Sequence, residues 1–196
     1  MSRTALYKMA YFGLVLGPTA LMVWFVLTHH RALSIPWIAL VIVLLLLPGR
    51  VLAYFWRDLL RGLHLLKQQR FEESKHHSEA FLVTLKQKPW LKNLIWLGFG
   101  TYSRSPACFA LNNLGAAEVG LGETENARVH LVAAIQTDGA SPLPYFNMGA
   151  LAASLNEHDE ARTWYEKAAA LGYSRSVIDA IIVSSQSRLA RSAGDS

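Results

Sequence analysis

Two long apolar runs open the chain. Residues 11–28 carry no charged side chain, and residues 35–56 carry only Arg50. A helix over the first run would rise about 27 Å, which is close to the thickness of the hydrocarbon core of a bilayer. No small-x-small cleavage site follows that run, and the second run comes at once, so a cleaved signal peptide is disfavoured. The pattern predicts a transmembrane hairpin in residues 1–56, with spans at about 11–28 and 33–49.

From residue 108 onward, apolar and small residues follow a helical spacing that occurs twice. Residues 108–141 align with residues 142–175 at an offset of 34 residues. The matched pairs are Leu111 with Tyr145, Asn113 with Asn147, Leu114 with Met148, Gly115 with Gly149, Ala127 with Ala161, Leu131 with Tyr165, and Ala134 with Ala168. Such a period predicts units of two helices joined by a turn, which bury their apolar faces by stacking.

These residues resemble the pattern of the tetratricopeptide repeat (TPR) family. Each unit reads large–x–x–Leu/Met–Gly in its first helix and Ala–x–x–x–Leu/Tyr–x–x–Ala in its second. Two features depart from the family: Glu118 stands where a tyrosine is usual, and Gly139 and Tyr173 replace the usual late proline. The resemblance implies a short solenoid of paired helices. It says little about function, because the family binds many unrelated partners.

Flanking segments complete the predicted architecture. Residues 57–87 match the repeat weakly, with Gly62 at the small position, and are expected to form a degenerate first repeat. Residues 88–106 interrupt the period with an apolar insertion. Residues 176–192 carry an apolar stripe and are expected to form a capping helix. The predicted fold class is therefore all-α: a two-helix transmembrane hairpin, then a short TPR-like α-solenoid with a C-terminal capping helix.

Charge is unevenly distributed along the chain. Residues 1–56 have four basic and no acidic residues, residues 57–104 have nine basic and four acidic, and residues 105–196 have six basic and ten acidic. The basic part adjoins the predicted spans, where it would face anionic lipid, while the acidic part would repel nucleic acid. Lysine and arginine are richer on both outer sides of the spans than in the loop between them. This places both termini and the repeats in the cytoplasm, and the overall character of the chain suggests a bacterial inner membrane.

No constellation of residues indicates catalysis or cofactor binding. The sequence has no glycine-rich phosphate loop, nucleophile elbow or His-Glu-x-x-His motif. Cys108 is the single cysteine, so it forms neither an internal disulfide nor a thiolate zinc site, and we expect it to be buried. His76 and His77 are neighbours on a predicted helix and would point about 100° apart, which suits a shared metal poorly. We expect a protein without enzymatic activity, cofactor or metal.

The candidate partner-binding residues follow from the resemblance. In TPR proteins the first helices line a concave groove, and an asparagine at the place of Asn113 and Asn147 often bonds the backbone of a bound peptide. Asn112 and Phe146, one step along each helix, would border that groove. The resemblance therefore implies that a peptide or helix of a partner protein binds there. The alternative is that these amides fit the helix pattern and contact only water.

A second set of candidates concerns the membrane interface. Trp90, Lys92 and Trp96 belong to the insertion, and tryptophan beside lysine is typical of interfacial segments. Arg50 can extend its charge to the interface from the end of the second span. The alternative for the insertion is an apolar elbow packed between the first two repeats.

These expectations combine into a non-enzymatic, membrane-tethered adaptor that binds a segment of a partner protein. A role in the assembly or regulation of a cell-envelope complex would suit such a scaffold. The alternative is a membrane-embedded subunit of a transporter or pore in which the hairpin is the working part. Neither predicted span carries an ionisable residue near its middle, which argues against that alternative. The sequence indicates neither the partner nor an oligomeric state.

Overall fold

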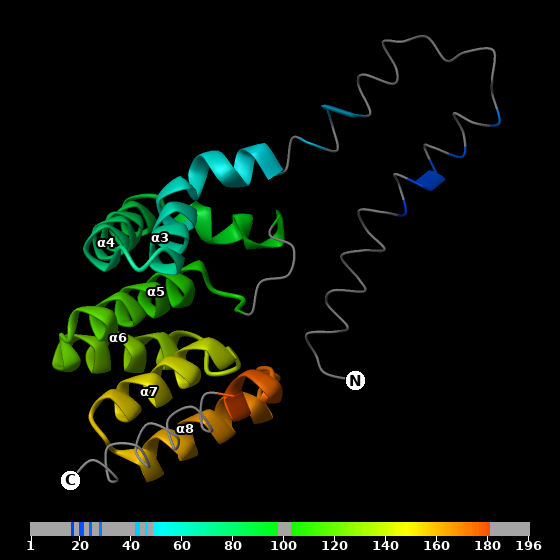
Figure 1. Cartoon of the computed structure of the whole chain (residues 1–196). Helices are drawn as coiled ribbons and strands as arrows, with labels where there is room; N and C mark the ends of the chain where they lie inside the picture. Colours follow the sequence, from blue (N-terminus) through cyan, green and yellow to red (C-terminus); the bar gives the residue numbers. More distant parts are fainter. Residues whose placement is uncertain are drawn as a thin grey trace, which may run out of the picture. The chain divides into compact units, whose positions relative to one another are not determined.

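The structure is a computed structural model that describes residues 49–97 and 103–180, with isolated positions between residues 17 and 46 (Figure 1). Every regular element in these ranges is helical, which confirms the all-α class. The chain divides into two compact units, Met1–Tyr54 and Phe55–Ser196.

The membrane hairpin predicted for residues 1–56 falls mostly in the first unit, Met1–Tyr54. Within the described part, none of the helices has both the length and the hydropathy needed to traverse a bilayer. The predicted spans, 11–28 and 33–49, lie outside the described residues apart from the isolated positions. Residues 49–55 are helical, and Trp56 forms a turn before the next helix.

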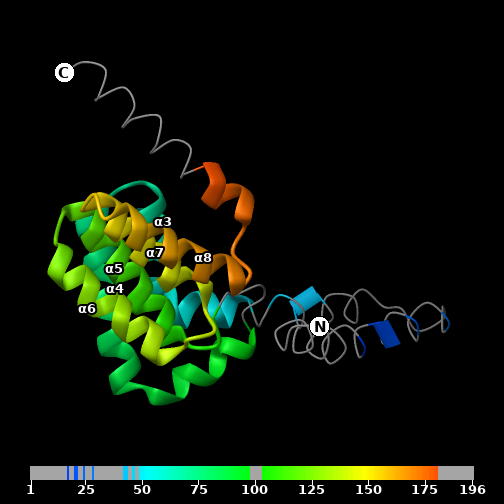
Figure 2. The same cartoon turned by 90° about the horizontal axis from the view of Figure 1, so that it is seen from below.

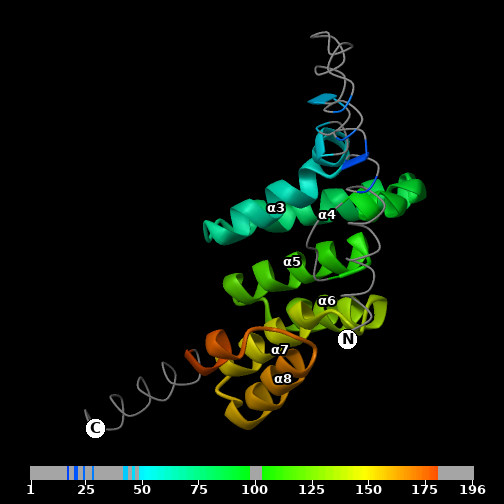
Figure 3. The same ribbon diagram turned by 90° about the vertical axis from the view of Figure 1, so that its right-hand side faces the viewer.

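Stacked helix pairs make up the described part of the second unit. The helices are α3 (Arg57–Lys67) with α4 (Phe71–Gln87), α5 (Pro106–Leu121) with α6 (Thr124–Thr137), and α7 (Pro142–Ser154) with α8 (His158–Ala170). Figure 3 shows the pairs as three successive tiers in chain order. This order is what stacking of neighbouring units along one direction produces.

The turn between the two helices is the same in every pair. A left-handed residue stands at its centre: Gln69 with φ 60°, Gly122 with φ 78° and Asn156 with φ 64°. The next residue then donates its backbone N–H to a carbonyl five residues earlier. These bonds are Arg70 to Leu65 at 3.0 Å, Glu123 to Glu118 at 2.9 Å, and Glu157 to Ala152 at 2.9 Å. Because glycine and asparagine tolerate positive φ best, Gln69 is the least suited of the three central residues.

Small residues allow the helices of each pair to approach closely. A Cβ atom built on Gly115 would lie 2.6 Å from the Cγ of Leu131, and one on Gly149 would lie 2.6 Å from the Cε1 of Tyr165. Both distances are far below ordinary carbon–carbon contact. Gly62 holds the same place in the first pair. It precedes Gly115 by 53 residues, which is the 34-residue period plus the 19 residues of the insertion 88–106.

The first pair uses polar side chains where the others use alanine and larger apolar groups. Ser74 and Ser78 are fully buried, and the hydroxyl of Ser74 donates to the carbonyl of Gly62 at 2.8 Å. Phe81 fills the remaining space, 1% exposed, with its ring edge-on to Trp56 at 6.2 Å. The hydrogen bond and the aromatic contact take the place of the tighter apolar packing found in the other pairs.

Apolar contacts join one pair to the next. Met148 and Leu151 of α7 pack against Ala127 and Leu131 of α6. Between the first two pairs, a Cβ atom on Gly120 would lie 2.6 Å from the ring of Phe71. These contacts cover part of the helix faces that are turned away from their own partners.

A short helical segment, residues 175–180, follows α8. Ile178 is 5% exposed and packs into a cluster with Tyr165 and Ala168 of α8. Figure 2, seen from the opposite end to the first pair, shows α7 and α8 lying across that end of the stack. The predicted capping helix, residues 176–192, lies outside the described residues from residue 181 onward.

The insertion between the first and second pairs contains a 3-10 helix, η1 (Pro89–Leu97). It packs against α4 and α5, and Leu91 is completely buried in that contact. The residues just before α5 are held by hydrogen bonds: the hydroxyl of Ser103 donates to Asp138 at 2.6 Å, and the hydroxyl of Ser105 accepts from the N–H of Cys108 at 3.3 Å. The start of α5 is thus fixed both by its own N-cap and by the end of α6.

Candidate functional site

The predicted partner-binding asparagines lie on α5 and α7. The side-chain amide of Asn147 donates to the side-chain oxygen of Asn112 at 2.8 Å, which joins the second pair to the third. Asn112 and Asn113 are 4% and 2% exposed, while Asn147 is half-buried. Asn113 and Asn147 share a place in the repeat, yet the structure pairs Asn147 with Asn112.

Asn113 contains a buried donor that is not satisfied. Among the described residues, its Nδ2 atom finds no hydrogen-bond acceptor although it is shielded from solvent. A buried donor in this condition costs about 1–3 kcal/mol, and a carbonyl that reached it would remove that cost. Of the four predicted groove residues, Asn113 therefore has the clearest unmet hydrogen-bonding capacity.

Phe146 contributes to packing at the end of the stack. Its ring is stacked on Tyr173, with centroids 4.3 Å apart and planes 19° apart, and lies 5.4 Å from the ring of Tyr165. These contacts hold the segment after α8 against the third pair. Ala116 and Ala150 lie four residues after Asn112 and Phe146, and both remain partly exposed. Like Asn147, these two alanines are therefore partly accessible on α5 and α7.

Two of the predicted membrane-interface residues lie together on η1. Trp90 is 47% exposed and packs edge-on against Phe55 with ring centroids 4.9 Å apart. Lys92 is exposed on the same short helix, and the buried Leu91 stands between Trp90 and Lys92 in the sequence. Trp96 also belongs to η1, but its side chain is outside the described part. Arg50 is exposed within the helical residues 49–55, in the other unit.

A charged cluster that the sequence did not suggest lies between α4, α5 and α6. Glu118 is only 1% exposed, and its carboxylate is 2.7 Å from Nδ1 of His130 and 3.9 Å from Nζ of Lys75. Lys75 also bonds to Glu123, which stands at the start of α6. The one signal in the sequence was that Glu118 occupies the place of a usual tyrosine. His130 is 12 residues away in the same pair, but Lys75 comes from the preceding pair and could not be inferred from that signal.

Burial governs the electrostatics of this cluster. Desolvation raises the pKa of Glu118, against the opposing effects of the hydrogen bond from His130 and the charge of Lys75. The hydrogen bond with Glu123 raises the pKa of Lys75, and the same bond lowers the pKa of Glu123. An almost fully buried carboxylate is thus held by partners from both neighbouring helices. The cluster fixes the first pair against the second, because removing one partner would leave a buried charge uncompensated.

Among the described residues, no group of three or more His, Cys, Asp or Glu side chains is arranged to hold a metal ion. His77 instead bonds to Asp58 at 3.1 Å, which links α4 to α3. Cys108 is fully buried, and burial raises the pKa of its thiol above the ordinary value.

In comparisons with known proteins, no family model, curated protein or solved structure matches the chain. The assignment of function therefore rests on the chain's own residues and their geometry.

Proposed function

We propose that the protein is a non-enzymatic adaptor in which a TPR-like stack of helix pairs binds a segment of a partner protein. A transmembrane hairpin in residues 1–56 tethers the stack to a membrane. Tethering raises the local concentration of the stack for any partner in the same membrane, which favours a role in assembling or regulating a membrane complex.

The observation that carries this proposal is the recurrence of one turn geometry in the three described helix pairs. The left-handed turn residues Gln69, Gly122 and Asn156 and their backbone hydrogen bonds occupy equivalent places in all three pairs. The glycine contacts of the second and third pairs are equivalent as well. Repeating units of this kind build an extended surface from their first helices, and such surfaces bind proteins.

The proposed binding face belongs to α5 and α7. It comprises the partly exposed Ala116, Asn147 and Ala150, with Asn113 beneath as an unsatisfied donor. Small side chains leave room for a peptide or helix to lie against the two helices. The acidic balance of residues 105–196 favours a neutral or basic segment over an acidic one.

A pair of matched arginine variants tests the proposal. Ala150→Arg places a long charged side chain on the proposed face, whereas Val129→Arg places the same side chain on α6, where Val129 is 64% exposed. Partners are captured by crosslinking in intact membranes and identified for the wild type and both variants. Circular dichroism verifies that the variants keep their helix content.

The expected result is that Ala150→Arg loses a partner that Val129→Arg retains. Equal capture by both variants would show that the first-helix face is not the binding surface. Loss with Val129→Arg alone would move the binding surface to the second helices.

A further inference from the structure

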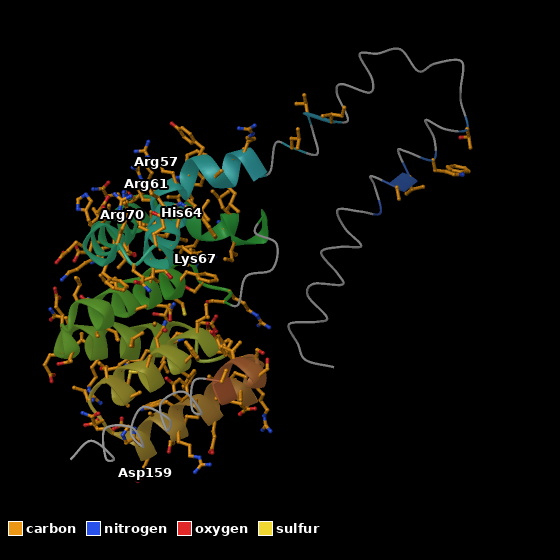
Figure 4. The ribbon with its side chains drawn as sticks, in the orientation of Figure 1. Arg57, Arg61, His64, Lys67, Arg70 and Asp159 are labelled. Carbon is orange, nitrogen blue, oxygen red and sulfur yellow. The ribbon has the colours of Figure 1, made fainter. Side chains whose placement is uncertain are left out.

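The exposed face of α3 carries cations that the stack itself does not use. Positions 57, 60, 61, 64, 67 and 68 recur at intervals of three or four residues, so they form one stripe along the helix. All of them are exposed, and they are Arg57, Leu60, Arg61, His64, Lys67 and Gln68. Figure 4 shows the labelled basic side chains gathered along α3. We call these six residues the α3 stripe.

Acidic residues are missing from this stripe. Asp58 is the one acid of α3, and it lies off the stripe, bonded to His77 of α4. Arg57 approaches Asp58 only at 3.8 Å, with its side chain 76% exposed. Among the described residues, no carboxylate lies within 4.0 Å of Arg61 or Lys67.

Several arginines and lysines elsewhere on the stack are arranged differently. Arg70 pairs with Glu73, Lys75 with Glu118 and Glu123, Arg128 with Glu157 and Glu160, and Arg162 with Glu166. Lys167 lies over the ring of Trp164. On the α3 stripe, by contrast, Arg61 and Lys67 have no carboxylate partner among the described residues, and their charges are available to an external anion. A group of like charges on one face raises the local electrostatic potential, which attracts an anionic surface.

An exposed leucine among the cations narrows the choice of partner. Leu60 is 43% exposed, and its place on the helix lies between those of Arg57 and Lys67. A phosphate backbone offers this leucine no apolar contact, whereas the boundary between headgroups and acyl chains accommodates leucine together with arginine and lysine. The stripe also begins at Arg57, directly after the apolar run 35–56.

From these observations we infer that the α3 stripe docks on the anionic surface of a lipid bilayer. Arg57, Arg61 and Lys67 contact the lipid phosphates, and Leu60 enters the interface between them. The inference rests on the proposed membrane attachment and adds to it a fixed contact between the first helix pair and the lipid. Each cation near such a surface contributes about a fivefold preference, so the three together favour the docked state on the order of 100-fold.

A spin label at Leu60→Cys in the full chain reports the docking directly. The chain is reconstituted into lipid discs of phosphatidylglycerol or of phosphatidylcholine, and the label's accessibility to oxygen and to a water-soluble nickel complex is compared. Cys108 is fully buried, and wild-type protein treated in parallel measures any labelling there. Val129→Cys on α6 serves as the control position.

In phosphatidylglycerol discs the label at position 60 should gain access to oxygen and lose access to nickel, whereas the label at position 129 should not change. The triple variant Arg57→Gln/Arg61→Gln/Lys67→Gln should abolish the difference between the two lipids, and high salt should weaken it. A matched variant, Arg162→Gln/Lys167→Gln/Arg175→Gln, should leave it intact because those cations lie at the far end of the stack.

Three outcomes would overturn the inference. If the chain enters the discs but position 60 stays equally accessible to nickel in both lipids, the stripe does not dock and the membrane attachment survives. If the chain does not enter the discs at all, the attachment and the docking both fail. The third outcome combines three results: duplex DNA binds the chain, the α3 triple variant abolishes that binding, and position 60 stays exposed to water in both lipids. In that case the stripe binds a polyanion other than lipid.

Discussion

Replacing Gly149 by alanine should destabilise the third helix pair, although alanine favours helices more than glycine does. The added Cβ would lie 2.6 Å and 2.7 Å from two ring carbons of Tyr165. Ordinary carbon–carbon contact is about 3.5–4.0 Å, so the ring would have to retreat by about 1 Å. Tyr165 is 4% exposed and its ring lies 5.4 Å from that of Phe146, which limits this movement.

The magnitude follows from two opposing effects. Alanine in place of glycine in a helix interior stabilises by about 1 kcal/mol. Overpacking a buried contact of this kind costs about 1–3 kcal/mol, so the net effect of Gly149→Ala is a fall in the free energy of unfolding of up to about 2 kcal/mol. The corresponding fall in melting temperature is up to about 8 °C for a chain of this size. Urea titration followed by circular dichroism measures the free energy.

A double-mutant cycle shows whether Tyr165 causes the loss. Tyr165→Val lacks the ring carbons nearest to the new Cβ, so in that background Gly149→Ala should cost nothing or stabilise. Gly139→Ala is the control, because its Cβ would meet no atom closer than 3.5 Å, and it should change stability by less than about 0.5 kcal/mol. If Gly149→Ala stabilises the wild-type chain, the close approach of the two helices is not as described.

Three further predictions concern the turns and the buried ionisable groups. Gln69→Gly should stabilise by about 0.5–1 kcal/mol because φ is positive there, and Gly122→Ala should destabilise by about 1 kcal/mol, both in urea titrations. Burial raises the pKa of Glu118 above its unfolded value, so its contribution to stability is lost as pH rises through the folded pKa. The free energy of unfolding of the wild type should therefore fall relative to that of Glu118→Gln as pH rises above about 4.3, and a constant difference would contradict this. Cys108 should react with a thiol reagent only at the rate of unfolding, and fast reaction of the native protein would refute its burial.

The pattern of small and large residues predicted the helix pairs well, because packing within a pair depends on residues near in sequence. Gly115 and Leu131 lie on the two helices of one pair, with one turn between them. Their contact can therefore be predicted from the sequence of a single repeat. Residues 57–87, the weakest match to the repeat, are helical in α3 and α4. Their identity was harder to see because Ser74 and Ser78 replace apolar residues and keep the geometry through a hydrogen bond.

Contacts between pairs were not predictable in the same way. Asn112 and Asn147 meet because of the rotation of one pair relative to the next, which no pattern within a repeat encodes. The burial of Glu118 depends likewise on Lys75, which reaches it from the preceding pair across the insertion. The sequence marked both sites, through an asparagine at a repeated place and a glutamate at an unusual one. It contained no information about their partners.

The joint between the first and second pairs has a mechanical consequence. Side chains of the two pairs are in direct contact there: Phe71 lies against Gly120, and Lys75 pairs with Glu118 and Glu123. The covalent connection between the two pairs runs through residues 88–105. A pull applied at the start of α3 is therefore borne first by these side chains. If they part, the connection could extend to about 60 Å before the backbone itself carries the load. The connection is thus long enough for the two parts of the stack to separate under tension and rejoin, and such a separation would also break the contacts of η1 with α4 and α5.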